Sequence, residues 1–566
     1  MVTAMKARLP LIVQDKLVAQ AKGIESVELI EVRDEEYFLD GPIIKSIAVV
    51  DFDPATSTVL PGVPFDPPTT EDGWGEYRAA STNALDSPSF INVNAFATVL
   101  LTKRMFEEPD VLGREVKWAF DGPQLFVVPR AGAWANAYYE RDSRSLQLFY
   151  FPSVRRSDRL IFTALSRDIV AHETAHAVLD GIAPDLYDAI TPQSLALHEA
   201  VADLSAFMMA TRSEVLCEAI LNAVQGDLTK YTALSSIAEE YASEQGEDRP
   251  LRNLFNDATL DPSKGGSPVD RSNPHELGTV LSGAMYSVFL RMYKAATTEV
   301  GVSSYSGSPA RYEKALFLAS QRLKRVMFRA LDYLPPGDVS FADYGRAMIA
   351  SDQKFYPNHE ETREWIRDEF LERAIVSDRS SLRVAVNPGD LQFTGEDLET
   401  MARSDWTAYR FANERRDWLG LPSGPFEVKP RLIVKKKYYH KDENKTVREL
   451  IFKIGWDVCE DNDIGAEFPK SRRLTVGMTM VFGFDDNRLH TILRTDHKDL
   501  QDEQVEQKKD RDSTLRWMAA KGLLLPFRVY QEYSPLFNTR AYADSTIEMM
   551  HIKGTGRMLH MSGGFR

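Results

Sequence analysis

Two segments with helical apolar spacing, residues 163–181 and 193–211, place the strongest constraint on how this chain folds. The first contains HETAH and the second contains HEAVAD. Each motif sets two polar side chains four residues apart, and such residues share one face of an α-helix. The rest of the second segment is Ala, Val, Leu, Phe and Met, so we expect it to be buried. Buried carboxylates need a partner such as a metal ion or another cation.

The spacing in the two motifs predicts a zinc site. His172 and His176 can present both imidazoles to one point, and Glu199 can supply the third protein ligand that catalytic zinc sites usually have. Asp203 would accept the free N–H of a ligand histidine and so fix its tautomer. Glu173 projects beside that point, which suits a general base acting on water at the metal.

Two other interpretations of the motifs remain. HETAH can occur by chance in a helix that merely carries two histidines, because short motifs give false positives. His198 is a rival to Glu199 as the third ligand, although the two side chains point about 100° apart on a helix. The apolar surroundings of Glu199 and Asp203 favour the zinc site with Glu199.

Composition excludes several classes of protein. The chain has 566 residues, which suggests three or four units at about 100 to 200 residues each. A net charge of −15 argues against a nucleic-acid or anionic-membrane binder. No stretch approaches the ~20 apolar residues that span a bilayer. Two distant cysteines and an N-terminus without a secretory signal pattern lead us to expect a cytoplasmic protein.

The sequence texture predicts an α+β protein in four parts. We expect a β-rich N-terminal region, an upper catalytic lobe with the HETAH helix, a helical catalytic lobe and a β-rich C-terminal domain. Their boundaries are 1–85, 86–190, 191–377 and 378–566. Further helices are expected at 91–106, 275–296, 310–334, 340–351 and 359–376, with a break at 335–338.

Several strands and three other segments can also be assigned. REVKWAF and PQLFVVP read as strands, and WANAYYERDSRSLQLFYFP as a hairpin with its turn at RDSRS. In the C-terminal part we expect strands at RLIVKKKYY, VRELIFKIGW and RRLTVGMTMVFGF. VKKKYYHKDENK indicates a charged hairpin turn more than a nucleic-acid patch. Residues 494–512 read as a solvated helix or linker, and KGTGRMLHMSGG as a flexible end.

HETAH followed by HEAVAD resembles the thermolysin-like metallopeptidases, the gluzincin group of zinc peptidases. The resemblance covers residues 85–377 and implies that family's catalytic core. It also implies that Tyr187 and His275 are donors to the transition state and that Asp270 orients His275. By the same resemblance, Arg252 contacts the substrate backbone, and Asn136 and Ala137 lie on an edge strand that pairs with the substrate.

The chain departs from the family pattern in three ways. Three extra residues separate Tyr187 from Glu199. Asp168 matches a calcium ligand of the family, but Ala210 stands where the family has a glutamate, which argues against a calcium site. The chain has no room before the catalytic region for both a signal and a long propeptide, so we expect an intracellular relative.

The expected function is therefore a zinc-dependent endopeptidase that hydrolyses peptide or protein substrates with water activated by Glu173 at the zinc. One alternative is a peptide-binding or scaffold protein that keeps the fold with little turnover. The other is a zinc hydrolase that acts on a non-standard amide, with the C-terminal domain selecting the substrate.

Overall fold

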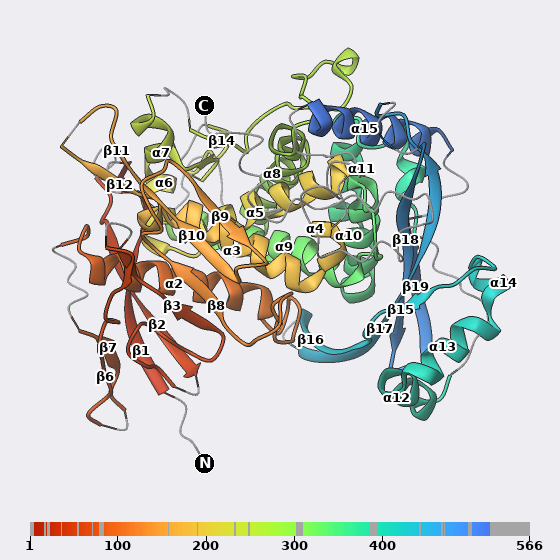
Figure 1. Cartoon of the computed structure of the whole chain (residues 1–566), viewed down its shortest axis with the longest axis horizontal. Helices are drawn as coiled ribbons and strands as arrows, with labels where there is room; N and C mark the ends of the chain where they lie inside the picture. The colour runs from red at the N-terminus through yellow and green to blue at the C-terminus, as the bar shows by residue number, and fades with distance from the viewer. Residues whose placement is uncertain are drawn as a thin grey trace.

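The computed structural model of this chain describes residues 5–520 except 16–17, 20–22, 36, 54–55, 71, 79–83, 157, 189–190, 231–233, 247–249, 302–308, 385–392, 441–442, 466–467, 469 and 496–500. It is 45% helical and 22% strand, which confirms the predicted α+β class. In Figure 1 small sheets lie at the N-terminal end, helices fill the middle, and a long sheet stands at the opposite side. No described helix is long and apolar enough to cross a membrane.

The N-terminal region forms a four-stranded sheet in the order β2-β1-β7-β6. Its strands are β1 (Met5–Ile12), β2 (Val27–Glu35), β6 (Phe65–Asp66) and β7 (Gly75–Tyr77), and β4 (Phe52–Asp53) pairs separately with β5 (Thr58–Val59). Along β1, Ala7, Leu9 and Leu11 are buried while Arg8 is exposed. The alternation is confined to the first part of the strand, because Pro10 and Ile12 are buried as well and the second part is covered on both faces.

A second sheet has the order β3-β8-β10-β9 and leaves β9 at an edge. Its strands are β3 (Ile47–Val49), β8 (Leu125–Val128), β9 (Ala137–Glu140) and β10 (Ser145–Leu148). β9 and β10 are antiparallel and join through the turn at 141–144, so the predicted hairpin is confirmed. PQLFVVP contains β8, as expected. β3 comes from the N-terminal region, so this sheet crosses the boundary expected at residue 85.

REVKWAF, at 114–120, is not a strand, and that prediction was wrong. The segment is held mainly by side-chain contacts. The amide of Val116 donates to Glu107 at 2.7 Å, and the indole of Trp118 donates to the carbonyl of Ser46 at 2.9 Å. Its apolar residues are buried one at a time against other elements. The resulting sequence pattern resembles that of a strand, although the segment pairs with no neighbouring strand.

Four helices build the centre of the molecule: α2 (Pro88–Glu107), α3 (Arg167–Ile182), α4 (Pro184–Asp188) and α5 (Pro192–Ala210). They confirm the helices expected near 91–106, 163–181 and 193–211, although 163–165 is a separate 3-10 turn, η1 (Thr163–Leu165). The buried Asn94 of α2 accepts from the amide of Ile12 and donates to the carbonyl of Ala164. One side chain therefore joins α2 to both β1 and η1.

Gly181 is the last residue of the predicted helical segment 163–181, but it lies inside α3. A side chain at this position would meet the backbone carbonyl of Lys117 at 2.1 Å. Gly181 is therefore required by the close approach of a neighbouring segment, and the helix continues past it to Ile182.

The remaining helices of the core follow the sequence closely. The predicted spans 275–296, 310–334, 340–351 and 359–376 correspond to α8 (Pro274–Glu299), α9 (Pro309–Arg329) with η3 (Ala330–Tyr333), α10 (Phe341–Phe355) and α11 (Glu360–Glu372). Three shorter helices were not predicted: α4, α6 (Glu214–Val224) and α7 (Glu239–Glu244). The short pair β13 (Ser236–Ile237) and β14 (Arg252–Asn253) flanks α7, and short 3-10 turns lie at η2 (Pro262–Lys264) and η4 (Arg379–Leu382).

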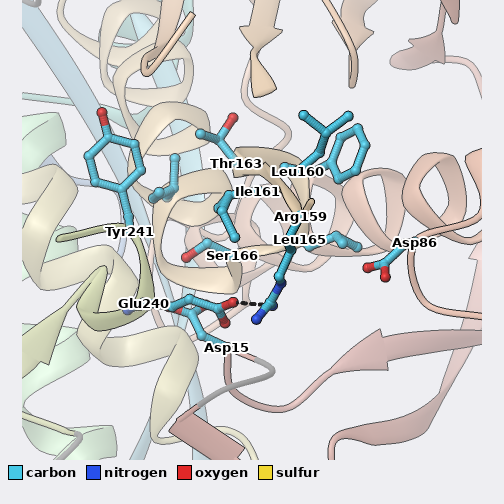
Figure 2. Close-up of a pocket in the computed structure, with 12 residues that line it drawn as sticks. Asp15, Asp86, Arg159, Leu160, Ile161, Thr163, Leu165, Ser166, Glu240 and Tyr241 are labelled. Atoms are coloured by element: carbon cyan, nitrogen blue, oxygen red, sulfur yellow. Dashed lines mark hydrogen bonds and ion pairs between the residues drawn. The ribbon is translucent and has the colours of Figure 1, made fainter. Parts of the chain in front are cut away.

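A hollow lies beside the start of α3, where several of these elements meet (Figure 2). Its walls come from β12 (Leu160–Phe162), η1, the first turn of α3 and α7. β12 pairs with β11 (Tyr150–Pro152), which follows directly after the β9–β10 hairpin.

The C-terminal part is a five-stranded antiparallel sheet with its own apolar cluster. The strands are β15 (Glu427–Val428), β16 (Leu432–His440), β17 (Glu443–Asp461), β18 (Ser471–Gly483) and β19 (Arg488–Arg494). β16 and β17 pair in register across VKKKYYHKDENK, so that segment is a hairpin as expected. Three unpredicted helices precede the sheet, α12 (Gly395–Arg403), α13 (Asp405–Glu414) and α14 (Arg416–Leu419).

The charged run at 494–512 contributes most of α15 (Gln501–Ala520). This helix is only partly solvated: Thr514 and Leu515 are buried, and Asp512 is 2.7 Å from Arg472 of β18. KGTGRMLHMSGG lies outside the described residues.

Buried charges join the C-terminal sheet to the helical lobe. Asp332 of η3 is fully buried, 2.6 Å from Arg114 and 3.3 Å from Lys436 of β16. Beside it the hydroxyl of Tyr333 donates to Glu449 of β17 at 2.8 Å. These contacts hold the sheet against the helical lobe, because separating the two would leave buried charges without partners, which is strongly destabilising.

Candidate metal centre

α3 presents two histidines toward α5 from a nearly completely buried helix. The ring nitrogens Nε2 of His172 and His176 are 3.1 Å apart. Asp168 lies in the first turn of α3, where a negative charge is favourable at a helix N-terminus. The four-residue spacing in HETAH therefore brings the two imidazoles to one point, as predicted.

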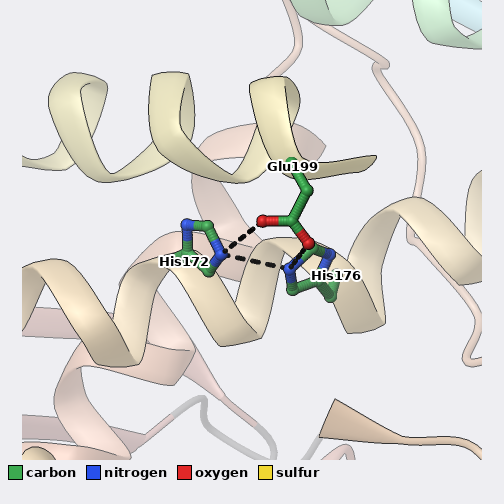
Figure 3. Close-up of side chains that lie close together, drawn as sticks. All are labelled: His172, His176 and Glu199. Carbon is green, nitrogen blue, oxygen red and sulfur yellow. Dashed lines mark hydrogen bonds and ion pairs between the residues drawn. The ribbon is translucent and has the colours of Figure 1, made fainter. Parts of the chain in front are cut away.

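Glu199 of α5 faces this pair (Figure 3). One carboxylate oxygen is 3.5 Å from Nε2 of His172 and the other is 3.6 Å from Nε2 of His176. The three ligand atoms all lie within 4.8 Å of one another. Ligands held tetrahedrally at the usual zinc distances of about 2.0–2.2 Å are separated by about 3.3–3.6 Å.

The chemistry of this group fits zinc. Glu199 is fully buried, and its Oε1 has no hydrogen-bond partner among the described residues. Imidazole nitrogen and carboxylate oxygen are both common zinc ligands, and a set of three is typical of catalytic sites. An unsatisfied buried oxygen that faces two imidazoles is therefore well explained as a metal ligand.

The surroundings of His172 favour a positive charge at this point. Its Nδ1 is 3.0 Å from Asp203, so the expected outer partner is in place. Burial alone would lower the pKa of His172, but hydrogen bonds to Asp203 and Glu199 raise that pKa to about 10. Burial would likewise raise the pKa of Glu199, yet His275 and His172 hold it well below its usual value. A proton on His172 and a metal ion would be stabilised by the same carboxylates.

His198 lies behind His176 and outside the ligand group. Its ring is fully buried and its Nδ1 is 3.4 Å from Nδ1 of His176. Burial lowers the pKa of His198 to about 3, so the ring is neutral and can accept the Nδ1 proton of His176. From the sequence, His198 was expected only as an alternative to Glu199 as the third ligand. Its position is instead that of a residue that hydrogen-bonds a ligand histidine from outside the ligand group.

Glu173 points from α3 toward the edge strand. It is 2% exposed, and its carboxylate accepts the backbone amide of Tyr139 in β9 at 3.1 Å. The proposed base therefore lies between the two histidines of its own helix and the strand that is expected to bind substrate.

Asn136 and Ala137 lie at the start of that edge strand, as the resemblance implied. Asn136 is buried, and its side-chain oxygen accepts from the amide of Ala137 at 2.9 Å. The backbone carbonyl of Asn136 accepts from the amide of Phe149, which holds the strand entrance against the neighbouring chain.

Arg252 and His275 converge on Glu199 from later elements of the same helical lobe. Nδ1 of His275 is 2.7 Å from the Glu199 carboxylate, and Nη2 of Arg252 is 2.6 Å from the same imidazole nitrogen. Arg252 also lies 3.4 Å from Asp203. Two residues that are far from HETAH in sequence are thus brought to the centre, while their roles toward substrate stay predictions.

Asp270 and Tyr187 occupy different positions around this centre. Asp270 is exposed and accepts from the amide and hydroxyl of Ser272, which shapes the turn before α8. Its orienting role toward His275 stays a prediction. Tyr187 of α4 is 3% exposed, and its ring packs edge-on against His198 with centroids 5.5 Å apart.

One group of residues near the centre was missed from the sequence. Asp180 is fully buried and accepts from the hydroxyl of Tyr139 at 2.8 Å and from Nε of Arg141 at 2.9 Å. These bonds fasten α3 to β9. Asp180 follows His176 by four residues, so the same helical spacing that revealed the histidines could have revealed it.

Comparisons with known proteins supply no further constraint: no protein-family model matches the sequence, and no curated protein is significantly similar to it.

Proposed function

We propose that this chain is a zinc-dependent endopeptidase. The observation that carries the proposal is the convergence of His172, His176 and Glu199 within 4.8 Å in a buried position. When bound, zinc would polarise the scissile carbonyl and lower the pKa of water in the site. The alternatives of a peptide-binding scaffold and a hydrolase of a non-standard amide remain, but no contact in the site favours either.

Glu173 supports hydrolysis over binding alone. Its carboxylate is buried next to the ligand helix face and is oriented by the amide of Tyr139. In the proposed reaction it takes a proton from the attacking water and delivers it to the leaving nitrogen. A binding module has no need of a base at this position.

Other residues of the chain would bind and stabilise the substrate. The edge strand β9 can accept an extended peptide by strand addition, which gives affinity largely independent of sequence. Tyr187 and His275 are the proposed donors to the negative charge that develops on the carbonyl oxygen. Arg252 is the proposed contact to the substrate backbone.

Metal analysis and peptide cleavage together test this proposal. We expect about one zinc per chain by elemental analysis, and a Glu199→Ala variant with much less. Incubation with a diverse peptide library should give cleavage that a chelator abolishes and zinc restores. Folded protein that takes up no zinc, or cleavage indifferent to the chelator, would refute the proposal.

A further inference from the structure

The hollow beside α3 combines apolar walls with an acidic end. The space between its walls, counted together with the open solvent at its mouth, is about 410 Å³. Leu160, Ile161, Leu165, Ile169 and Tyr241 contribute apolar surface. Figure 2 shows Asp15 and Glu240 next to each other at one end, with the guanidinium of Arg159 beside Glu240.

Two walls of this hollow are connected to elements that carry residues of the proposed site. Ile169 precedes His172 by three residues on α3, so the two share a helix face. The hydroxyl of Tyr241 donates to the carbonyl of Ala135 at 2.7 Å, one residue before Asn136. The helix that carries the histidines and the segment leading into the edge strand are therefore both in contact with its walls.

Asp15 is the acidic residue in this hollow without a cationic partner. It is 3% exposed, and its Oδ1 has no hydrogen-bond partner among the described residues. Its Oδ2 accepts a long bond from the amide of Glu240, at 3.4 Å. Arg159 is engaged elsewhere, 2.6 Å from Glu240 and 4.0 Å from Glu244.

The charge around Asp15 is unbalanced. Burial, and then the neighbouring carboxylates of Asp168 and Glu240, raise the pKa of Asp15 well above its usual value. Ser166 lies on the same wall, and a hydrogen bond from its hydroxyl to Asp15 partly opposes this rise in the pKa. A cation that entered the hollow would find the unsatisfied Oδ1 of Asp15 among several carboxyl groups.

An organic cation fits this arrangement better than a metal ion. Among the described residues, only His172, His176 and Glu199 form a group of three with ligand atoms within 4.8 Å. The carboxylates around Asp15 are therefore too widely spaced to hold one ion together. A lysine side chain instead has an apolar stem for Ile161, Leu165 and Ile169 and an ammonium group for the acidic end.

We propose that this hollow is a side-chain subsite that selects a basic residue, foremost lysine, in the peptide substrate. The inference rests on the proposed peptidase function and names the substrate class of that same site. Asp15 is the residue that recognises the ammonium group, and its unsatisfied Oδ1 accepts a charge-assisted hydrogen bond from it.

The test compares lysine with norleucine, which has a similar length and no charge. A single lysine is moved through each position of one cleavable norleucine-containing peptide. We expect one position at which lysine raises kcat/KM by about tenfold or more, as a charge-assisted hydrogen bond would. In Asp15→Asn the lysine to norleucine ratio at that position should fall close to one, while the exposed control Asp121→Asn keeps the wild-type ratio.

Binding provides a second readout that does not need turnover. Fluorescence anisotropy with labelled lysine and norleucine peptides, on the Glu173→Gln variant, should show the same preference and the same loss on adding Asp15→Asn. Equal binding of both peptides would overturn the inference. So would a calcium-induced rise in Tm that disappears in Asp15→Asn, because it would place a metal ion at the acidic end.

The two proposals fail in different ways. Absence of chelator-sensitive cleavage of any peptide would refute the peptidase function. Chelator-sensitive cleavage without a lysine preference at any position would leave that function intact and refute only the subsite.

Discussion

Nδ1 of His172 lies 3.0 Å from a carboxylate oxygen of Asp203, and the other oxygen of Asp203 lies 3.4 Å from Nε of Arg252. Asp203 therefore joins a proposed zinc ligand to a proposed substrate-binding residue. Because the carboxylate accepts a hydrogen bond from Nδ1–H, it keeps the proton on Nδ1 and leaves the Nε2 lone pair of His172 directed at the metal position.

Replacing Asp203 should weaken zinc binding without removing the site. We expect Asp203→Ala to raise the zinc Kd about 10- to 100-fold, as loss of an outer partner typically does. Asp203→Asn keeps an acceptor oxygen but loses the charge, so its zinc Kd should lie between those of wild type and Asp203→Ala. Competition with a chromogenic chelator measures the Kd. Ser205→Ala, a buried change on the same helix, is the control, and an unchanged Kd in Asp203→Ala would contradict the assignment.

Glu173→Gln should separate metal binding from catalysis. The amide cannot act as a base, so kcat should fall about 10²- to 10⁴-fold. Zinc content should stay at the wild-type level because Glu173 is outside the ligand group. Glu115→Gln, an exposed glutamate that the site does not use, is the matched control and should cleave normally. Cleavage by Glu173→Gln at the wild-type rate would mean that another group is the base.

His198 should behave as a positioning residue for His176 and not as a ligand. We expect His198→Ala to retain one zinc per chain with a weaker Kd, because the Nδ1 proton of His176 loses its acceptor. His198→Asn can supply an acceptor oxygen and should recover part of the affinity. If His198→Ala instead loses zinc as completely as Glu199→Ala, the sequence's rival assignment is right.

The sequence predicts features that depend on residues close together in the chain better than features that depend on contacts between distant segments. The pairs in HETAH and HEAVAD reflect helical spacing, a local property, and the structure brings His172, His176, Glu199 and Asp203 together as expected. REVKWAF failed because its apolar pattern arises from burial by distant segments and not from strand pairing.

Contacts between remote segments could not be anticipated from local patterns. Asp15 lies in an unremarkable stretch of the N-terminal region, and only the fold brings it beside Asp168 and Glu240. The same holds for Gly181, whose requirement comes from the carbonyl of Lys117 and not from a helix end. Local patterns also do not describe the substrate. The roles toward it of Tyr187, Asp270 and Arg252 therefore stay predictions.

The ion pairs of Asp332 should make the junction between the helical lobe and the C-terminal sheet sensitive to acid. Burial alone would raise the pKa of Asp332, but Arg114 and Lys436 lower it to about 2. A carboxyl with a lower pKa in the folded state contributes stability above its unfolded pKa of about 3.9, and this is lost as pH falls through the folded value. The total contribution should be about 2–3 kcal/mol, lost progressively between about pH 5 and pH 1.

Urea unfolding of wild type and Asp332→Asn at a series of pH values measures this contribution. Asp332→Asn should be less stable at neutral pH by about 3–5 kcal/mol, because it leaves the charges of Arg114 and Lys436 buried without their partner. The difference between the two proteins should shrink as pH falls from about 4 to 2, where the wild-type carboxyl becomes protonated. A difference that stays constant across this range would show that Asp332 does not titrate with the folded protein, and that its charge does not hold the sheet to the lobe.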